Sequence, residues 1–178
     1  MQIKDLHFEP YLSQQAIQEE IIKLAKAINR EHDGNNPIFI AVLNGAFIFM
    51  ADLARHISIS SEITFVKVKS YEQLQSTGEH REFIGLEVPI EGRHLIIVED
   101  IVDSGNTIQF LLKQLRGQHP ASISVATLLF KPEALKQPID VNYVGFRIPN
   151  DFVVGYGLDY DGLGRNLPDI HKLKNGNQ

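Results

Sequence analysis

The 178-residue sequence contains no cysteine, which excludes disulfides, thiolate zinc sites and a cysteine nucleophile. It also lacks surplus positive charge, because 17 lysines and arginines face 22 aspartates and glutamates, a formal net charge of −5. Sequence-independent nucleic-acid binding needs such a surplus, so we expect no nucleic-acid partner. Long apolar runs are missing too: residues 38–43 fall far short of the roughly 18 residues of a membrane span. Together with the lack of a signal peptide, these absences predict a cytoplasmic protein that does not associate with membranes.

What is present indicates one folded domain over residues 1–178, since 43% of the residues are hydrophobic and no repeat or linker occurs. Only residues 172–178 have the composition of a flexible tail. Short continuous apolar runs alternate with helical stripes: we expect strands at residues 38–43, 95–98, 123–130, 141–146 and 152–155, and helices after Ser13, Gly45 and Gly105. The alternation predicts an α/β fold, a mostly parallel twisted sheet flanked by helices, with ligands beyond the carboxyl ends of its strands.

The stretch of residues 95–107 carries the most chemistry. A buried strand runs into the adjacent acids Glu99 and Asp100, and Asp103-Ser104-Gly105-Asn106-Thr107 then opens a helix. Gly105 permits a positive φ, and the N–H groups of such a turn form a cradle for an anion. The two acids would repel a phosphate but suit sugar hydroxyls and a hard cation such as Mg²⁺. Singly, the acids could be solvated and Ser104 a helix N-cap; together they predict a site for a phosphorylated sugar with metal.

Residues 98–107 resemble the motif that binds 5-phosphoribosyl pyrophosphate (PRPP) in the type I phosphoribosyltransferases. Further segments resemble one branch of that family, the hypoxanthine-guanine phosphoribosyltransferases of purine salvage. These segments are residues 42–47, 69–71, 128–132, 143–149, 152–160 and 165–168. They occur in the family's order and extend the resemblance over the chain from about residue 38 to residue 170. The resemblance implies the type I phosphoribosyltransferase fold, with a small hood over the carboxyl ends of the strands.

The resemblance implies an enzyme that joins hypoxanthine, guanine or both to PRPP, giving the nucleoside monophosphate and pyrophosphate. Residues 103–107 would hold the 5′-phosphate, and Asp103 would also accept a proton at the purine imidazole ring. Glu99 and Asp100 would face the ribose hydroxyls and Mg²⁺, the expected cofactor, which would neutralise the leaving group. Asp159 would serve a second Mg²⁺ or the purine edge.

The same resemblance assigns residues to the purine. Lys131 would donate to the 6-oxo group and so select hypoxanthine and guanine over adenine. Phe152 would stack on the base, and the backbone of Val153 would read the edge of the base. Without the resemblance, Lys131 would be interpreted as a solvent-exposed lysine at a strand end and Phe152 as a core residue.

Pyrophosphate binding is implied for the turn Leu43-Asn44-Gly45, where the family uses a strained, often cis, peptide, and for Arg165. Ser70 and Tyr71, with residues 72–81, would form a mobile loop that closes over the site. The sequence departs from the family at two positions: Asn44 stands where many relatives carry lysine, and Gly164 stands where an aromatic residue usually precedes the arginine. The first departure removes a cation and shifts the binding of pyrophosphate towards Mg²⁺, the backbone and Arg165. The second loosens the segment that carries Arg165 and so weakens the assignment of this residue to pyrophosphate.

Two other functions fit parts of the pattern. A PRPP-sensing regulator on the same fold could lose Asp103 and would usually add a basic face or a DNA-binding module, whereas this acidic chain keeps Asp103. A receiver-type signalling domain needs an acid pair after its first strand, and residues 43–45 supply none. We therefore expect an enzyme, with the ranking of hypoxanthine, guanine and xanthine left open. The family's habit and the apolar residues 47–51 favour a homodimer or homotetramer.

Overall fold

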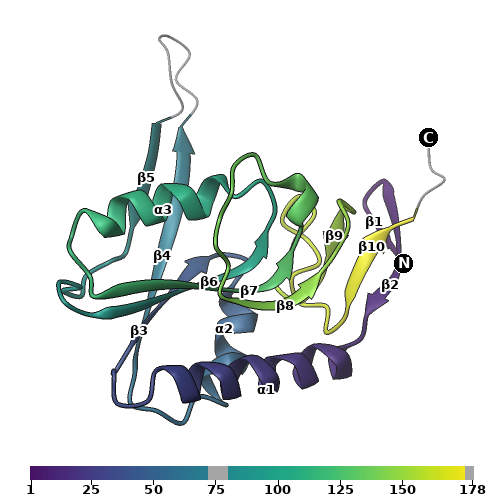
Figure 1. Ribbon diagram of the computed structural model, residues 1–178. Coiled ribbons are helices and arrows are strands. Elements are labelled where there is room, and N and C mark those ends of the chain that lie inside the picture. Colours follow the sequence, from purple (N-terminus) through teal and green to yellow (C-terminus); the bar gives the residue numbers. More distant parts are fainter. Residues whose placement is uncertain (72–79, 175–178) are drawn as a thin grey trace.

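The computed structural model describes residues 1–71 and 80–174, whose strands form two sheets (Figure 1). The elements are β1 Gln2–Ile3, β2 Leu6–Leu12, α1 Gln14–Glu31, β3 Ile38–Leu43, α2 Phe47–Ala54, β4 Glu62–Tyr71, β5 His80–Ile84, β6 His94–Val102, α3 Asn106–Arg116, β7 Ser122–Phe130, a 3-10 turn Pro132–Ala134, β8 Tyr143–Arg147, β9 Val153–Val154 and β10 Ile170–Leu173. The expected α/β class is confirmed.

The larger sheet has six strands in the order β5-β4-β3-β6-β7-β8. Its strands run parallel from β4 to β8, and β5 is the antiparallel edge strand. The central strand β3 is buried along all but its last residue. This explains its continuous apolar run, because a parallel strand covered on both faces has no polar side.

Helices cover both faces of this sheet, α1 and α2 on one face and α3 on the other (Figure 1). α1 buries the apolar stripe that the sequence predicts, which is Ile17, Ile21, Leu24, Ala25 and Ile28. Its N-terminus is capped by the Ser13 hydroxyl, which accepts a hydrogen bond from the Ala16 N–H at 3.2 Å. None of the helices in the described residues is long and apolar enough to span a bilayer.

The smaller sheet has the strand order β1-β2-β10-β9; together with residues 155–169, which join β9 to β10, it is called the hood below. It joins the two ends of the described chain, since β10 pairs antiparallel with β2. Lys172 and Leu173 belong to β10, and the Lys174 N–H donates to the His7 carbonyl at 2.9 Å. The prediction of a flexible tail from residue 172 is therefore wrong for these residues, because hydrogen bonds to the N-terminal strand hold them. Residues 175–178 lie outside the described part of the chain.

Other boundaries also differ from the prediction. β6 continues past its apolar run to Val102, so Glu99 and Asp100 lie inside the strand. β9 covers only Val153 and Val154, which leaves Phe152 ahead of the strand. The sequence did not predict β1, β2, β4, β5 or β10, which are short or only partly buried and therefore lack a continuous apolar run.

Candidate active site

The turn between β6 and α3 forms a cradle of backbone N–H groups. Gly105, with φ of 79°, is the N-cap of α3 and offers no side chain to cap the helix. Ser104 is therefore not the N-cap, although its hydroxyl accepts a long hydrogen bond of 3.4 Å from the Asn106 N–H. A hollow of about 80 Å³ lies at this turn and is lined by Glu99, Ile101, Asp103, Ser104, Gly105, Asn106, Thr107 and Ile108. Uncapped N–H groups beside hydroxyls suit a bound phosphate.

Two acids lie at the end of β6 in surroundings that disfavour their charge. Glu99 is buried, and its Oε2 has no hydrogen-bond partner among the described residues. Burial, with the charge of Asp100 beside it, raises the pKa of Glu99 well above its usual range. Burial also raises the pKa of Asp100 to about 6, although the Ile101 N–H and the Arg165 charge favour the ionised form. Such a pair is stabilised by a bound cation.

The turn after β3 lies directly against Asp100. A Cβ on Gly45 would lie 1.7 Å from Asp100 Oδ2, so only glycine fits there. The preceding peptide, Leu43–Asn44, is cis, as the resemblance implies. From the hood side Gly157, with φ of 100°, approaches the same turn, since its Cβ would lie 2.1 Å from the Gly45 carbonyl oxygen. Asp100 of β6 and the segments that follow β3 and β9 therefore meet at one point.

The hood contributes an acid and a base to this meeting point. Arg165 Nη2 lies 2.6 Å from Asp159 Oδ1, and both side chains are half-buried. Arg165 Nη1 donates to the Gly157 carbonyl at 2.6 Å, and the Gly162 N–H donates to Asp159 Oδ2 at 2.7 Å. Arg165 and Asp159 are close enough to Asp100 to affect its pKa in opposite directions. Within residues 1–71 and 80–174, however, no three histidine or acid side chains converge as a metal site.

Lys131 and Asp103 form an ion pair across the ends of β7 and β6. The Lys131 Nζ lies 3.0 Å from Asp103 Oδ2, and the lysine side chain is 6% exposed whereas the aspartate side chain is 49% exposed. The interpretation of Lys131 as a solvent-exposed lysine is therefore wrong, because the side chain turns inward to its acid. The pair places a proton donor and a proton acceptor side by side.

Phe152 is 42% exposed and does not fill the core. Its ring packs instead in the hood, 6.1 Å from the Phe8 ring and 5.8 Å from the Tyr160 ring. The following residue, Val153, is buried. An aromatic ring that is held by two others and partly open to solvent can stack on a planar ligand.

Ser70 and Tyr71 are the last residues of β4, and the predicted mobile loop continues into residues 72–79, which lie outside the described residues. The sequence pattern did not single out Gly157, although glycines at 155 and 157 signalled an unusual backbone there. It could not show that this glycine contacts Gly45, because the two are 112 positions apart.

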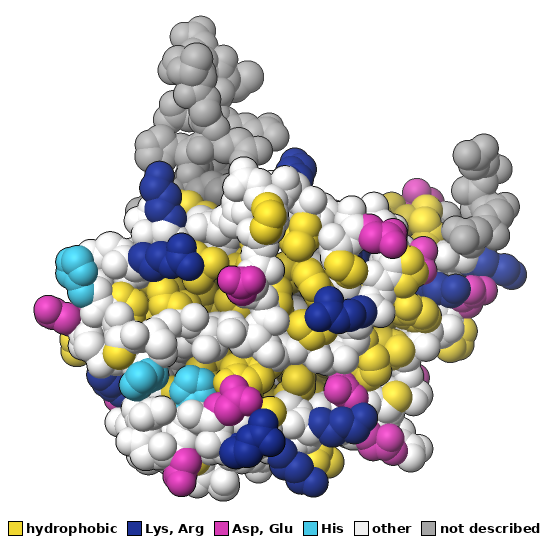
Figure 2. Space-filling model, in the orientation of Figure 1, with side chains coloured by type: hydrophobic (Ala, Val, Ile, Leu, Met, Phe, Trp, Pro, Cys, Tyr) yellow, Lys and Arg dark blue, Asp and Glu magenta, His cyan; other side chains and the backbone are white. Residues whose placement is uncertain are grey.

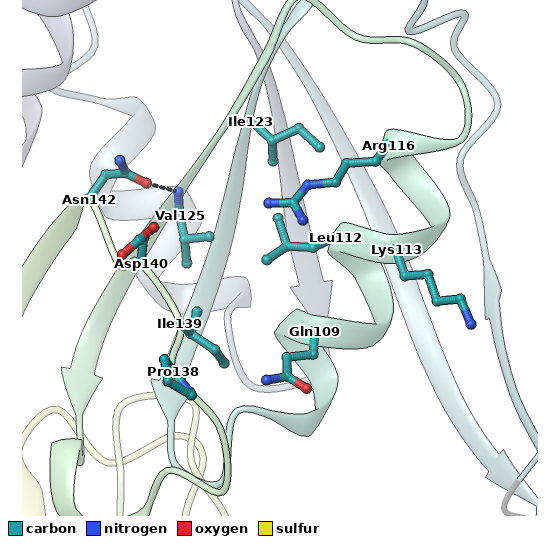
Figure 3. Close-up of a pocket in the computed structure, with 10 residues that line it drawn as sticks. All are labelled: Gln109, Leu112, Lys113, Arg116, Ile123, Val125, Pro138, Ile139, Asp140 and Asn142. Carbon is teal, nitrogen blue, oxygen red and sulfur yellow. Dashed lines mark hydrogen bonds between the residues drawn. The ribbon is translucent and has the colours of Figure 1, made fainter.

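A hollow of about 610 Å³ occurs elsewhere, between α3 and β7 (Figure 3). Arg116 points into it, Lys113 points away, and Asp140 lies on the opposite wall (Figure 3). None of the predicted site residues lines this hollow. The chemistry is therefore concentrated at the smaller cradle, where charged groups and backbone donors converge.

Comparison with known proteins identifies the family of this chain. Residues 7–161 match the family model of the phosphoribosyl transferase domain. The chain belongs to the phosphoribosyltransferase family. The hypoxanthine-guanine phosphoribosyltransferase of Bacillus subtilis is 42% identical over 164 residues, which cover 92% of this chain and 91% of that protein.

A crystal structure of a hypoxanthine-guanine phosphoribosyltransferase from Bacillus anthracis matches with a TM-score of 0.87 at 37% identity, over 96% of this chain and 100% of that one. The chain is also 42% identical to the bifunctional protein TilS/HprT of Listeria innocua, of which it spans only 25%. The family and branch predicted from the sequence, and the fold that they imply, are confirmed.

The contact between Gly45 and Asp100 predicts the effect of Gly45→Ala. The added methyl group overlaps a carboxylate that has little room to move, so we expect a loss of about 1–3 kcal/mol in the free energy of unfolding, measured with urea. The control is Gly117→Ala, at φ of −64° with its nearest atom 3.5 Å from the added Cβ. It should be neutral or slightly stabilising. Equal effects of the two changes would contradict the contact.

The raised pKa of Asp100 predicts how stability depends on pH without metal. Its pKa is about 6 in the folded protein against 3.8 for an ordinary aspartate, so folding takes up a proton between these values. The stability that this carboxyl contributes is present below about pH 4 and is lost as the pH rises through 6. Asparagine cannot ionise and keeps the acceptor for the Ile101 N–H.

We therefore expect the stability of Asp100→Asn, relative to the parent, to increase by about 2 kcal/mol from about pH 4 to about pH 7. Urea unfolding in the presence of a metal chelator at several pH values measures this difference. The exposed Asp140→Asn is the control and should show no such trend. A difference between Asp100→Asn and the parent that stays constant with pH would show that Asp100 ionises normally.

Proposed function

We propose that the protein is an enzyme that transfers the phosphoribosyl group of PRPP to hypoxanthine, guanine or both. In this reaction a bond forms between the ribose C1 and a ring nitrogen of the purine, the bond from C1 to the pyrophosphate oxygen breaks, and the base loses its N–H proton. The observation that carries the proposal is the meeting of three segments, which brings the cradle at residues 103–107, the acids Glu99 and Asp100, and Arg165 together. The names of the relatives support the activity.

The ion pair of Lys131 and Asp103 supports a 6-oxopurine as the acceptor. The oxo group and the imidazole nitrogen are neighbouring atoms on one edge of such a base. Lys131 donates to the oxo group, and Asp103, 3.0 Å away, accepts the proton from the imidazole side. A 6-amino group would offer the buried lysine no acceptor on the base, so the pair disfavours adenine. Phe152 covers the face of the base.

The phosphates and the ribose take the remaining groups. The N–H groups of the cradle and the hydroxyls of Ser104 and Thr107 hold the 5′-phosphate. The turn at residues 43–45 and Arg165 hold the pyrophosphate, and Arg165 exchanges Asp159 for it.

Glu99 and Asp100 fit a magnesium ion, because both offer hard carboxylate oxygens and one of them, Glu99 Oε2, is buried without a partner among the described residues. Within the described residues no third acid or histidine converges with them, so the chain itself would offer the ion these two carboxylates. Mg²⁺ held by these carboxylates would supply positive charge to the leaving pyrophosphate. Asp159 serves a second ion or the purine edge once Arg165 turns to the pyrophosphate.

A regulator that senses PRPP is less well supported. Figure 2 shows lysines and arginines mixed with acids on the face in view, without a continuous basic surface over the described residues there. The acid proposed to accept the proton, Asp103, is present and partly exposed. These features favour the enzyme, and a cytoplasmic location is part of the same proposal, because the cysteine-free sequence suits a reducing compartment.

The experiment that tests the function supplies purified protein with PRPP, Mg²⁺ and one purine at a time, and measures pyrophosphate release. We expect turnover with hypoxanthine or guanine and little with adenine. No turnover with any 6-oxopurine would refute the proposal.

The role of Asp103 predicts a large loss of turnover in Asp103→Ala, about 10²–10⁴-fold in kcat, because the purine proton has no acceptor. Binding of PRPP, measured by calorimetry, should stay within a few-fold, since backbone N–H groups hold the phosphate. Asp103→Asn keeps an oxygen for Lys131 but cannot accept the proton, and should lose turnover similarly. Unchanged turnover in both variants would exclude Asp103 as the proton acceptor.

We also propose that the chain forms a homodimer or homotetramer. The apolar residues 47–51 do not provide the surface as a whole, because Phe49 and Met50 are buried in the core. A better surface is the apolar patch of Ile63 and Phe65 on β4 with Ile84 on β5, all of them exposed. Strand register and the alternation of side chains place the three on one face of the sheet, the face of α2. Exposed apolar patches of this kind mark interfaces.

This patch predicts that Phe65→Glu shifts the mass measured by sedimentation velocity to that of the 20.1-kDa monomer, while the parent sediments as a dimer or tetramer. Leu163→Glu is the matched control, because Leu163 is equally exposed but lies outside the patch, and it should sediment like the parent. A monomeric parent, or the same shift in both variants, would rule out this surface.

A further inference from the structure

A partly buried hydrogen-bond network lies behind the proposed site, centred on Tyr156. The Tyr156 hydroxyl donates to Asp52 Oδ2 at 2.5 Å, and the Gln18 amide donates to the same oxygen at 2.7 Å. The other oxygen of Asp52 pairs with Arg55 at 2.9 Å. Burial and the charge of Asp52 raise the pKa of Tyr156, so its hydroxyl stays protonated and donates. This network, called the Tyr156 network below, ties α1, α2 and the segment after β9 together.

Each end of the hydrogen bond between Tyr156 and Asp52 is attached to a different part of the site. Asp52 belongs to α2, which begins two residues after Gly45 of the proposed pyrophosphate turn. Tyr156 directly precedes Gly157, whose carbonyl accepts a hydrogen bond from Arg165. The Cα of Gly157 also packs against the carbonyl oxygen of Gly45. The bond therefore joins, through α2, the turn and the arginine that are proposed to hold the same pyrophosphate.

The backbone at Tyr156 depends on such an anchor. Its φ is 51°, in the left-handed region that residues other than glycine rarely adopt. Its N–H donates to the Leu167 carbonyl, and the next N–H, of Gly157, donates to the Arg165 carbonyl, both at 2.9 Å. Residues 155–158 and 165–167 are thus linked by their backbones. A shift of the Tyr156 ring would be passed to Arg165.

We propose that Tyr156 is a positioning residue for pyrophosphate binding, which acts by holding Arg165 in register with the turn at Gly45. The inference rests on the proposed function for the identity of the ligand. Tyr156 does not touch the ligand itself, since its hydroxyl is buried against the helices. It sets the distance between Arg165 and the turn at Gly45, which are proposed to bind one anion together. Small displacements of such groups lower the affinity for the anion.

The test compares Tyr156→Phe with a matched control, Tyr143→Phe. Tyr143 is also buried, and its hydroxyl donates to a carboxylate of α1, Glu31, at 2.7 Å. Each change removes one hydroxyl oxygen, and with it one hydrogen bond from a tyrosine to a carboxylate, so both should lower the thermal midpoint of unfolding. Only Tyr156→Phe is expected to weaken the binding of magnesium pyrophosphate, measured by calorimetry, and to raise the KM for PRPP, each about tenfold. The KM for the purine should stay within about twofold.

Two further variants separate positioning from loss of folding. Gln18→Ala removes the other donor to Asp52 Oδ2, at a partly exposed position on α1. It should also weaken pyrophosphate binding, but less than Tyr156→Phe does. The double variant Tyr156→Phe, Asp52→Asn should bind pyrophosphate as tightly as whichever single variant has the lower affinity. The reason is that both changes act on the hydrogen bond between these two residues. Additive losses would contradict this.

The inference is overturned if Tyr156→Phe and Gln18→Ala both bind pyrophosphate as the parent does, or if Tyr143→Phe weakens binding equally. It is also overturned if the parent binds no magnesium pyrophosphate. A parent that binds pyrophosphate but turns over no 6-oxopurine would refute the proposed function alone, since the calorimetric comparison of the variants needs no turnover.

Discussion

The carboxylate of Asp100 lies so close to the backbone of Gly45 that no side chain fits between them. On its other side the same glycine touches Gly157, which is again a contact that excludes a Cβ. Strand β6 and two loops from distant parts of the sequence are therefore packed backbone to backbone or backbone to carboxylate. Because protein interiors are close-packed, moving one of these loops displaces the others. The acids of β6, the turn after β3 and the hood segment thus behave as one unit.

This packing removes two acids from water, which disfavours their charged forms and affects how charge is distributed in the site. Glu99 and Asp100 are adjacent and poorly solvated, so both resist ionisation. The two basic residues nearby, Arg165 and Lys131, are already paired with Asp159 and Asp103. A net charge of −5 would oppose the binding of an anionic ligand only if the phosphates of that ligand had to lie against unpaired acids. Here backbone N–H groups line the cradle, and in the proposed reaction the bases become available by exchanging partners.

The hood shows how the ends of the chain take part in the site. Phe152 is held by Phe8 from β2 and by Tyr160, and β2 is in turn paired with β10 near the C-terminal end of the described residues. The Tyr156 network then fastens the segment after β9 onto α1 and α2. The orientation of the ring proposed to cover the base therefore depends on residues at the start of the sequence. No local pattern around Phe152 contains that information.

The sequence by itself determined the α/β class, the long central strands and helices, and the residues at 99–107, because these depend on periodicity and on adjacent residues. It also indicated the roles of Lys131, Asp159 and Arg165 through the resemblance, without showing which groups they meet. Only the tertiary structure decided that Lys131 is buried on Asp103, that Phe152 is exposed, and that residues 172–174 are held in the hood. The physical reason is that these features depend on contacts between residues far apart in the chain. The close approach of Gly45, Asp100 and Gly157 is such a contact, and the spacing of these residues in the sequence does not predict it.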